Sequence, residues 1–156
     1  MRIAMIGGGY VGLVSGACFA EFGSDVVVVE ADPAKLEMLR EGHIPIYEPG
    51  LEKIVDGNVA AGRLSFTDDL GASLDDVDAV FIAVGTPTRR GGGHADLTYV
   101  YEAARQIARA AKSDLVVVTK STVPVGTGRE VARILAEERP DRTFSVASNP
   151  EFLREG

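Results

Sequence analysis

Short apolar runs along this chain alternate with longer segments in which apolar side chains recur at helical spacing. The runs have the length of strands, and the four consecutive valines at residues 26–29 indicate a strand that is buried on both faces. The predicted strands are residues 3–6, 26–29, 64–66, 79–84, 115–119 and 144–147.

The segments between these runs predict helices, and two of them carry recognisable start signals. Asp32 is expected to cap a helix that has Pro33 in its first turn, and Asp96 is expected to cap a later helix. Strands that alternate with helices are typical of a parallel, doubly wound α/β sheet, here of about six strands, with right-handed crossovers. The predicted helices are residues 10–22, 33–40, 51–56, 97–111 and 127–138.

Composition and charge narrow the class of protein. The 156 residues are 46% hydrophobic and 25% charged, which fits one globular domain. The formal net charge of -7 and the absence of a basic cluster larger than Arg89 and Arg90 argue against binding to nucleic acid or to an anionic membrane. Cys18 is the single cysteine and excludes a disulfide within the chain, and no apolar run approaches the roughly 20 residues of a membrane span. We therefore expect a cytoplasmic protein.

Residues 7–12, Gly-Gly-Gly-Tyr-Val-Gly, fit the pattern G-x-G-x-x-G. They follow a predicted strand, open a helix and lie in a βαβ unit of about thirty residues, the context in which this pattern indicates a dinucleotide site. Gly7 permits a tight turn, Gly9 lets a pyrophosphate approach the backbone, and Gly12 lets the helix pack closely. The amide groups at the helix start would hold the diphosphate, so that a net-acidic protein can bind an anion. The expected fold is therefore Rossmann-like.

Glu30 stands at the end of the valine strand, 18 residues after Gly12. A carboxylate at this place accepts hydrogen bonds from both adenosine ribose hydroxyls and repels a 2′-phosphate, which favours NAD over NADP. Lys35 lies nearby and would soften that preference. The alternative interpretations are a solvated charge at a strand end for Glu30 and an ordinary helix-face charge for Lys35.

Three later strands end in polar, proline-containing segments: residues 84–88, 119–124 and 148–151. Because parallel strands present their carboxyl ends at one edge of a sheet, we expect these segments to share one rim of the ligand site. The alternative is that their threonines and prolines only form turns.

Five segments in this order resemble the NAD-binding domain of the UDP-glucose/GDP-mannose dehydrogenase family: residues 7–12, 45–51, 84–88, 120–127 and 149–156. The resemblance covers the whole chain, and its last two segments are highly specific. It implies oxidation of the C6 alcohol of a nucleotide sugar to a carboxylate, in two hydride transfers to two NAD+, with a cysteine that carries a thiohemiacetal and then a thioester. The resemblance favours UDP-glucose as the substrate, with GDP-mannose or UDP-N-acetylmannosamine as alternatives.

The resemblance also implies a role for each matching residue. A first group would bind the cofactor: Gly7, Gly9, Tyr10, Val11 and Gly12 the pyrophosphate, Glu30 and Lys35 the adenosine ribose, and Val84, Gly85, Thr86, Pro87, Ser121 and Thr122 the rest of its path, with Glu155 near the nicotinamide. Tyr10 alternatively holds the turn in place. A second group would serve the reaction: Glu151 as general acid/base, Thr122 as the residue that orients the water or reacting oxygen, and Glu151, Phe152, Leu153 and Arg154 as contacts of the sugar nucleotide. From the residues alone, Glu151 follows a proline at a strand's end, where a carboxylate can be held for proton transfer. The alternative interpretation is a solvated carboxylate near the end of the chain.

The family enzymes are more than twice this length, and their central helix, nucleotide-sugar domain and catalytic cysteine would lie after residue 156. We therefore expect residues 1–156 to be one NAD-binding domain and an N-terminal fragment that binds NAD without turnover. The resemblance implies a homodimer that forms mainly through the central helix. Without that helix, we expect the fragment to be monomeric or to associate through exposed apolar surface. Cys18 lies mid-helix beside small and aromatic residues and is expected to be an inert, buried thiol. His43 and His94 show no metal-ligand spacing, so no metal is expected.

Two other classes of function stay open at this point. One is a stand-alone Rossmann-like module that senses NAD(H). The other is a different NAD enzyme, such as a hydroxyacid or hydroxyacyl dehydrogenase, which would share the glycine loop but not residues 120–127 or 149–156.

Overall fold

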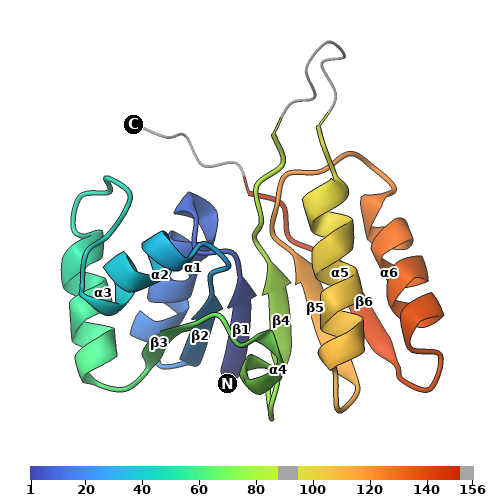
Figure 1. Cartoon of the computed structure of the whole chain (residues 1–156), viewed down its shortest axis with the longest axis horizontal. Helices are drawn as coiled ribbons and strands as arrows, with labels where there is room; N and C mark the ends of the chain where they lie inside the picture. Colours follow the sequence, from blue (N-terminus) through green and yellow to red (C-terminus); the bar gives the residue numbers. More distant parts are fainter. Residues whose placement is uncertain (88–94, 152–156) are drawn as a thin grey trace.

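The computed structural model describes residues 1–87 and 95–151, which build one six-stranded, all-parallel sheet with helices on both faces (Figure 1). The strands lie in the order β3-β2-β1-β4-β5-β6, so the chain winds outward in one direction from β1 and then in the other from β4. This arrangement confirms the predicted doubly wound α/β sheet. The strands are β1 Arg2–Ile6, β2 Asp25–Val29, β3 Leu64–Thr67, β4 Ala79–Ile82, β5 Leu115–Thr119 and β6 Phe144–Ser148.

Strand β1 lies at the centre, paired in register with β2 on one side and β4 on the other. Its side chains alternate between the two faces of the sheet, as a strand requires. Ile3 and Met5 join the core on the face covered by α1 and α3, whereas Ala4 and Ile6 join the core on the face covered by α5 and α6. All four are buried, which explains why the run is continuously apolar.

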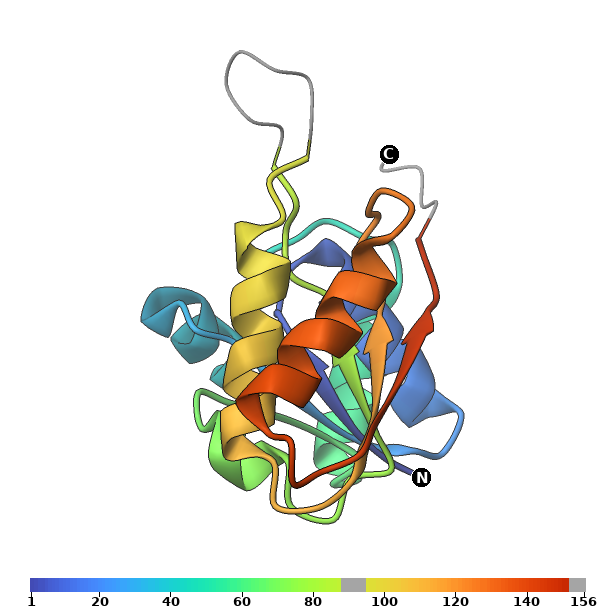
Figure 2. The same ribbon diagram turned by 90° about the vertical axis from the view of Figure 1, so that its right-hand side faces the viewer.

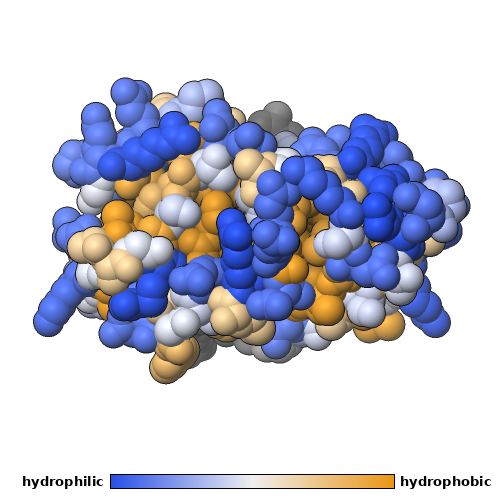
Figure 3. Space-filling view, turned by 90° about the horizontal axis from the view of Figure 1, so that it is seen from below, coloured by the Kyte–Doolittle hydropathy of each residue, from blue (hydrophilic) through white to orange (hydrophobic). Residues whose placement is uncertain are grey.

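The helices are α1 Tyr10–Glu21, α2 Pro33–Arg40, α3 Leu51–Ala60, α4 Leu70–Ser73, α5 Thr98–Ala110 and α6 Thr127–Glu138. Helices α5 and α6 lie side by side in front of the sheet in Figure 2, with α1 and α3 behind it. Seen from the end at which the strands begin, the surface mixes hydrophilic and hydrophobic side chains (Figure 3). In the described part of the chain, no helix is long and apolar enough to cross a membrane.

Two expectations about the helices were wrong. Helix α3 continues past Asp56 to Ala60, because Asn58 is fully buried and its amide donates hydrogen bonds to Glu21 and to the carbonyl oxygen of Ile54. The short helix α4 was not predicted. It has a single turn, whose start is fixed by the carboxylate of Asp69, which accepts a hydrogen bond from the Ala72 amide at 2.9 Å.

The predicted caps were close to correct. Asp32 accepts hydrogen bonds from the amides of Ala34 and Lys35, and Pro33 opens α2. Asp96 accepts from the amide and the hydroxyl of Thr98, at 3.1 and 2.6 Å, although α5 begins at Thr98, one residue later than expected. Strand β4 ends at Ile82 rather than at residue 84, because the chain after it turns away to line a cleft.

Candidate dinucleotide-binding site

A cleft of about 580 Å³ opens beyond the carboxyl ends of β1, β2 and β4. It therefore lies at the point where the strand order reverses, the place at which open α/β sheets bind ligands. The lining comes from the end of β1 and the glycine loop, the end of β2, α2, the segment from β3 into α4, the segment after β4, and α5. Its residues are Ile6, Gly7, Gly8, Gly9, Val29, Glu30, Ala31, Lys35, Asp68, Leu70, Ala83, Val84, Gly85, Pro87, Tyr99, Glu102, Ala103 and Gln106.

The glycine loop has the geometry that its motif predicts. Gly7 has a φ of +110°, and a Cβ there would lie 2.7 Å from the carbonyl oxygen of Ala83, so the turn requires glycine. Gly9 is the N-cap of α1, and nothing lies within 4 Å of the place where its Cβ would stand. Gly12 packs directly against the backbone of Gly7. The open space beside Gly9 is what a bound diphosphate would need.

Tyr10 and Val11 directly follow the glycine loop but do not line the cleft, and their side chains are directed elsewhere. As the first residues of α1 after its glycine cap, they present amide groups that have no acceptor within the helix. The Tyr10 hydroxyl donates a hydrogen bond to the carboxylate of Glu48, and Val11 packs against the core under α1. Tyr10 thereby ties the start of α1 to the loop before α3, which supports the alternative interpretation, in which its side chain holds the turn.

Glu30 is 9% exposed and is fixed by two backbone amides. Its Oε2 accepts a hydrogen bond from Gly8 at 3.1 Å, and its Oε1 accepts from Asp32 at 2.8 Å. Each carboxylate oxygen keeps acceptor capacity, so the group is held ready for further donors such as hydroxyls. Lys35 is exposed and lines the same cleft, as expected.

Gly8 is a site residue that the motif did not single out, because the pattern leaves its position free. Its amide binds Glu30, and a Cβ at Gly8 would lie 2.8 Å from the Glu30 Oε2 atom. A glycine at this place therefore lets the loop approach the acidic residue at the end of β2.

Among the residues that the structure describes, the cleft wall carries more acidic than basic side chains. Glu30, Asp68 and Glu102 line it, against Lys35 as the basic residue. The described acidic side chains would repel a diphosphate, whereas the amide groups and the positive end of α1 would attract it. This agrees with the expectation that a net-acidic chain uses backbone rather than lysines to bind an anion.

The ends of β4, β5 and β6 meet on one rim, as predicted. The Ser121 hydroxyl donates to the carbonyl oxygen of Val84 at 2.7 Å, and the Thr86 hydroxyl donates to that of Thr122 at 3.3 Å. The Thr122 hydroxyl in turn donates to the carbonyl oxygen of Glu151 at 2.6 Å. Val84, Gly85 and Pro87 line the cleft, whereas Thr86, Ser121, Thr122 and Glu151 are not among its lining residues.

Sequence reasoning missed the role of Lys120 on this rim. Its ammonium lies 2.7 Å from the Glu151 Oε2 atom and 3.1 Å from the Asn149 Oδ1 atom. The side chains of Lys120 and Glu151 are only 11% and 19% exposed. The signal available was a lysine directly after a buried strand, which does not say which carboxylate it meets. Thr88, Phe152, Leu153, Arg154 and Glu155 lie outside the described residues, and their roles stay predictions.

The model of one family matches residues 1–156 from end to end: the UDP-glucose/GDP-mannose dehydrogenase family, NAD binding domain. This chain belongs to that family. Its match to the family's NAD-binding domain agrees with the glycine loop and with Glu30. The match favours this family over a stand-alone NAD(H) sensor or a different class of NAD enzyme.

Relatives within the family share both sequence and fold with this chain. It is 64% identical over 156 residues to the UDP-glucose 6-dehydrogenase of Rhizobium meliloti, covering 100% of this chain and 36% of that protein. Among solved structures, a UDP-glucose dehydrogenase from Pyrobaculum islandicum matches with a TM-score of 0.92 and 47% identity, over 99% of this chain and 36% of that one. A ternary complex of GDP-mannose dehydrogenase from Pseudomonas aeruginosa matches with a TM-score of 0.93 and 38% identity, over 99% and 37%. The chain thus spans little more than a third of the relatives it matches.

Proposed function

We propose that this chain is the NAD-binding part of an enzyme that oxidises UDP-glucose to UDP-glucuronate with two NAD+. The observation that carries the proposal is the 64% identity, over every residue of the chain, to a UDP-glucose 6-dehydrogenase. The identity is also higher to a solved UDP-glucose dehydrogenase than to a solved GDP-mannose dehydrogenase, 47% against 38%, although the two folds match equally well. A solved UDP-D-ManNAc dehydrogenase from Pyrococcus horikoshii is 31% identical. Sequence rather than fold therefore favours UDP-glucose over GDP-mannose or UDP-N-acetylmannosamine.

The described residues fit NAD. The space beside Gly9 admits a diphosphate, which the amides of Gly9, Tyr10, Val11 and Gly12 would bind, while Gly7 shapes the turn. Glu30 is held with its carboxylate at the cleft wall, where it would accept hydrogen bonds from the adenosine ribose, with Lys35 beside it.

The far end of the cofactor would lie along Val84, Gly85, Thr86 and Pro87, next to Ser121 and Thr122. When bound, NAD+ supplies the hydride acceptor for the oxidation.

The rim formed by Thr122 and Glu151 would serve the sugar. Glu151 accepts the proton that leaves the C6 hydroxyl and later activates the water that releases the carboxylate. The Thr122 hydroxyl donates to the carbonyl oxygen of Glu151. Thr122 would also orient the water or the reacting oxygen, as the resemblance implies. Phe152, Leu153 and Arg154 would contact the sugar nucleotide, and Glu155 would lie near the nicotinamide, as the resemblance implies. We place the nucleophilic cysteine and the nucleotide-sugar domain in parts of the whole protein outside these 156 residues, and expect that protein to be a homodimer.

The first test measures binding to the 156-residue chain by calorimetry, with NAD+ and NADP+ in parallel. We expect NAD+ to bind and NADP+ to bind more weakly. No heat with NAD+ would contradict the cofactor site.

The second test uses the whole protein with UDP-glucose, GDP-mannose and UDP-N-acetylmannosamine at equal concentration. Two NADH formed per UDP-glucose, with UDP-glucuronate as the product, is the expected result. A faster reaction with either other sugar would replace UDP-glucose as the substrate while leaving the cofactor site in place.

A further inference from the structure

We propose that Lys120 is a positioning residue that holds the Glu151 carboxylate in the orientation needed for proton transfer. The inference rests on the proposed function, because it takes Glu151 as the group that meets the substrate. Lys120 is a residue to which neither the glycine motif nor the resemblance assigned a role.

The backbone at both ends of this contact is fixed before the side chains meet. Lys120 directly follows β5, and its amide donates to the carbonyl oxygen of Ile82 at 2.8 Å. On the neighbouring strand, the Asn149 amide donates to the carbonyl oxygen of Thr119 at 2.9 Å. The parallel pairing of β5 with β6 runs up to this point, with Thr119 opposite Ser148. Lys120 is thus placed by two strands, β4 and β6, rather than by a loop alone.

The ammonium of Lys120 makes two directed contacts from this fixed base. It donates to the Asn149 Oδ1 atom and to the Glu151 Oε2 atom, using two of its three hydrogens. The Thr122 hydroxyl holds the carbonyl oxygen of the same glutamate at 2.6 Å. The segment after β5 therefore fixes Glu151 twice, once by its backbone and once by its carboxylate.

Burial separates this ion pair from an ordinary surface pair. The Lys112–Asp75 pair has the same 2.7 Å separation, but its side chains are 67% and 43% exposed, against 11% and 19% for Lys120 and Glu151. Exposed pairs are screened by water and hold no fixed geometry, whereas a sheltered ammonium exerts a strong directional pull on its partner. The sheltered pair can therefore orient a carboxylate, and the exposed pair serves as its control.

The test uses the whole protein and measures kcat and KM with UDP-glucose and NAD+ for four variants. Lys120→Met removes the charge at similar length, Lys120→Arg keeps it, Glu151→Gln removes the acid/base, and Lys112→Met removes the matched exposed ammonium. We expect Lys120→Met to lower kcat about tenfold or more, with both KM values within about twofold of wild type. Lys120→Arg should recover most of that loss, and Lys112→Met should match wild type.

The deciding measurement is the double variant Lys120→Met/Glu151→Gln. If Lys120 acts through Glu151, the double variant has the same kcat as Glu151→Gln alone; if it has a merely structural role, the two losses multiply and the inference is overturned. Full kcat in Glu151→Gln overturns the inference while leaving the proposed oxidation standing, whereas a wild-type protein that oxidises no nucleotide sugar removes both. Should Lys120→Met fail to fold, Lys120→Gln takes its place in the same cycle.

Discussion

The position of a Cβ on Gly12 would lie 1.9 Å from the carbonyl oxygen of Gly7, inside any possible contact distance. Gly7 and Gly12 therefore touch through their backbones. The group that a Cβ on Gly12 would meet is the Gly7 carbonyl, which cannot rotate away as a side chain could. We predict that Gly12→Ala costs about 2–3 kcal/mol in the free energy of unfolding, because the helix has to move off the loop. Urea denaturation of the 156-residue chain measures this, and a midpoint equal to wild type would contradict the packing argument.

Gly9 is expected to behave in the opposite way. Its φ is -78°, which an alanine adopts easily, and no atom lies within 4 Å of its Cβ position. Gly9→Ala should therefore leave stability nearly unchanged and weaken NAD+ binding at least tenfold, because the methyl group enters the space left for the diphosphate. The matched control is Gly57→Ala on the exposed side of α3, which should raise stability by about 1 kcal/mol and leave the Kd for NAD+ unchanged. Equal NAD+ affinity in Gly9→Ala and wild type would remove this loop from the site.

Glu30→Ala tests the choice between cofactors. The variant loses the carboxylate that the Gly8 and Asp32 amides hold at the cleft wall. Two hydrogen bonds from ribose hydroxyls to a charged group justify an expected loss of at least tenfold in NAD+ affinity. NADP+ affinity should fall less, because the repulsion of a 2′-phosphate disappears at the same time, so the preference for NAD+ narrows. Calorimetry with both cofactors measures this, with Glu37→Gln on the solvent side of α2 as the control; an unchanged ratio would contradict the role of Glu30.

Local patterns were enough to predict the strands and the glycine loop. The alternation of buried positions in β1 and the steric demands at Gly7 depend on residues close in the chain or on backbone geometry alone. The contact of Lys120 with Glu151 joins residues 31 positions apart, and the hydrogen bond from Gly8 to Glu30 joins residues 22 apart. Such contacts depend on which strands become neighbours. The sequence of apolar and polar residues within one strand does not identify the strand that will pair with it. The length of α3 depended likewise on the burial of Asn58 against α1.

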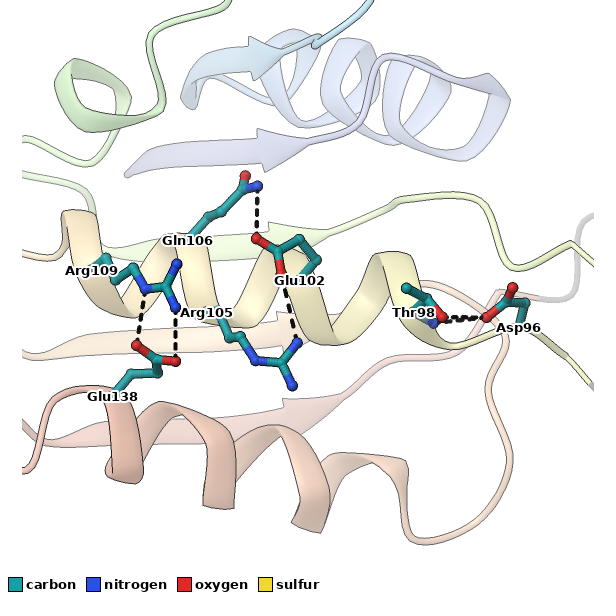
Figure 4. A network of polar contacts seen from close by, with 7 residues as sticks. All are labelled: Asp96, Thr98, Glu102, Arg105, Gln106, Arg109 and Glu138. Carbon is teal, nitrogen blue, oxygen red and sulfur yellow. Dashed lines mark hydrogen bonds and ion pairs between the residues drawn. The ribbon is translucent and has the colours of Figure 1, made fainter.

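Carboxylates on α6 and just after its end should make the fold sensitive to acid. Arg109 on α5 binds Glu138 on α6 through two hydrogen bonds, at 2.9 and 3.1 Å, and this hydrogen bonding lowers the pKa of Glu138 (Figure 4). Hydrogen bonds from Arg133 lower the pKa of Glu130, and those from Arg139 lower the pKa of Asp141 to about 2.

A carboxyl group whose pKa is lower in the folded state stabilises the fold above its unfolded pKa, near 4, and loses that contribution as the pH falls through the folded value. We therefore predict that the thermal midpoint falls between about pH 5 and pH 2. Glu138→Gln should lower it slightly at pH 7 and make the fall with acid shallower, whereas Glu37→Gln on α2 should leave the slope as in wild type. If the thermal midpoint of Glu138→Gln falls with decreasing pH as steeply as that of wild type, the Arg109–Glu138 pair contributes nothing to the acid sensitivity.

Thr119, at the end of β5, should be more stable as valine. Its side chain is 1% exposed, and among the described residues its hydroxyl has no hydrogen-bond partner. Folding therefore removes the hydrogen bonds of this hydroxyl with water and puts none in their place. Thr119→Val keeps the shape and removes the hydroxyl, and is expected to raise the free energy of unfolding by about 1 kcal/mol. Thr127→Val is the matched control, since that hydroxyl is also buried but donates to the Pro124 carbonyl at 2.8 Å, and its loss should cost about 1 kcal/mol. Urea denaturation of both variants measures the sign of each change in the free energy of unfolding. A destabilised Thr119→Val would mean that the Thr119 hydroxyl has a hydrogen-bond partner in solution.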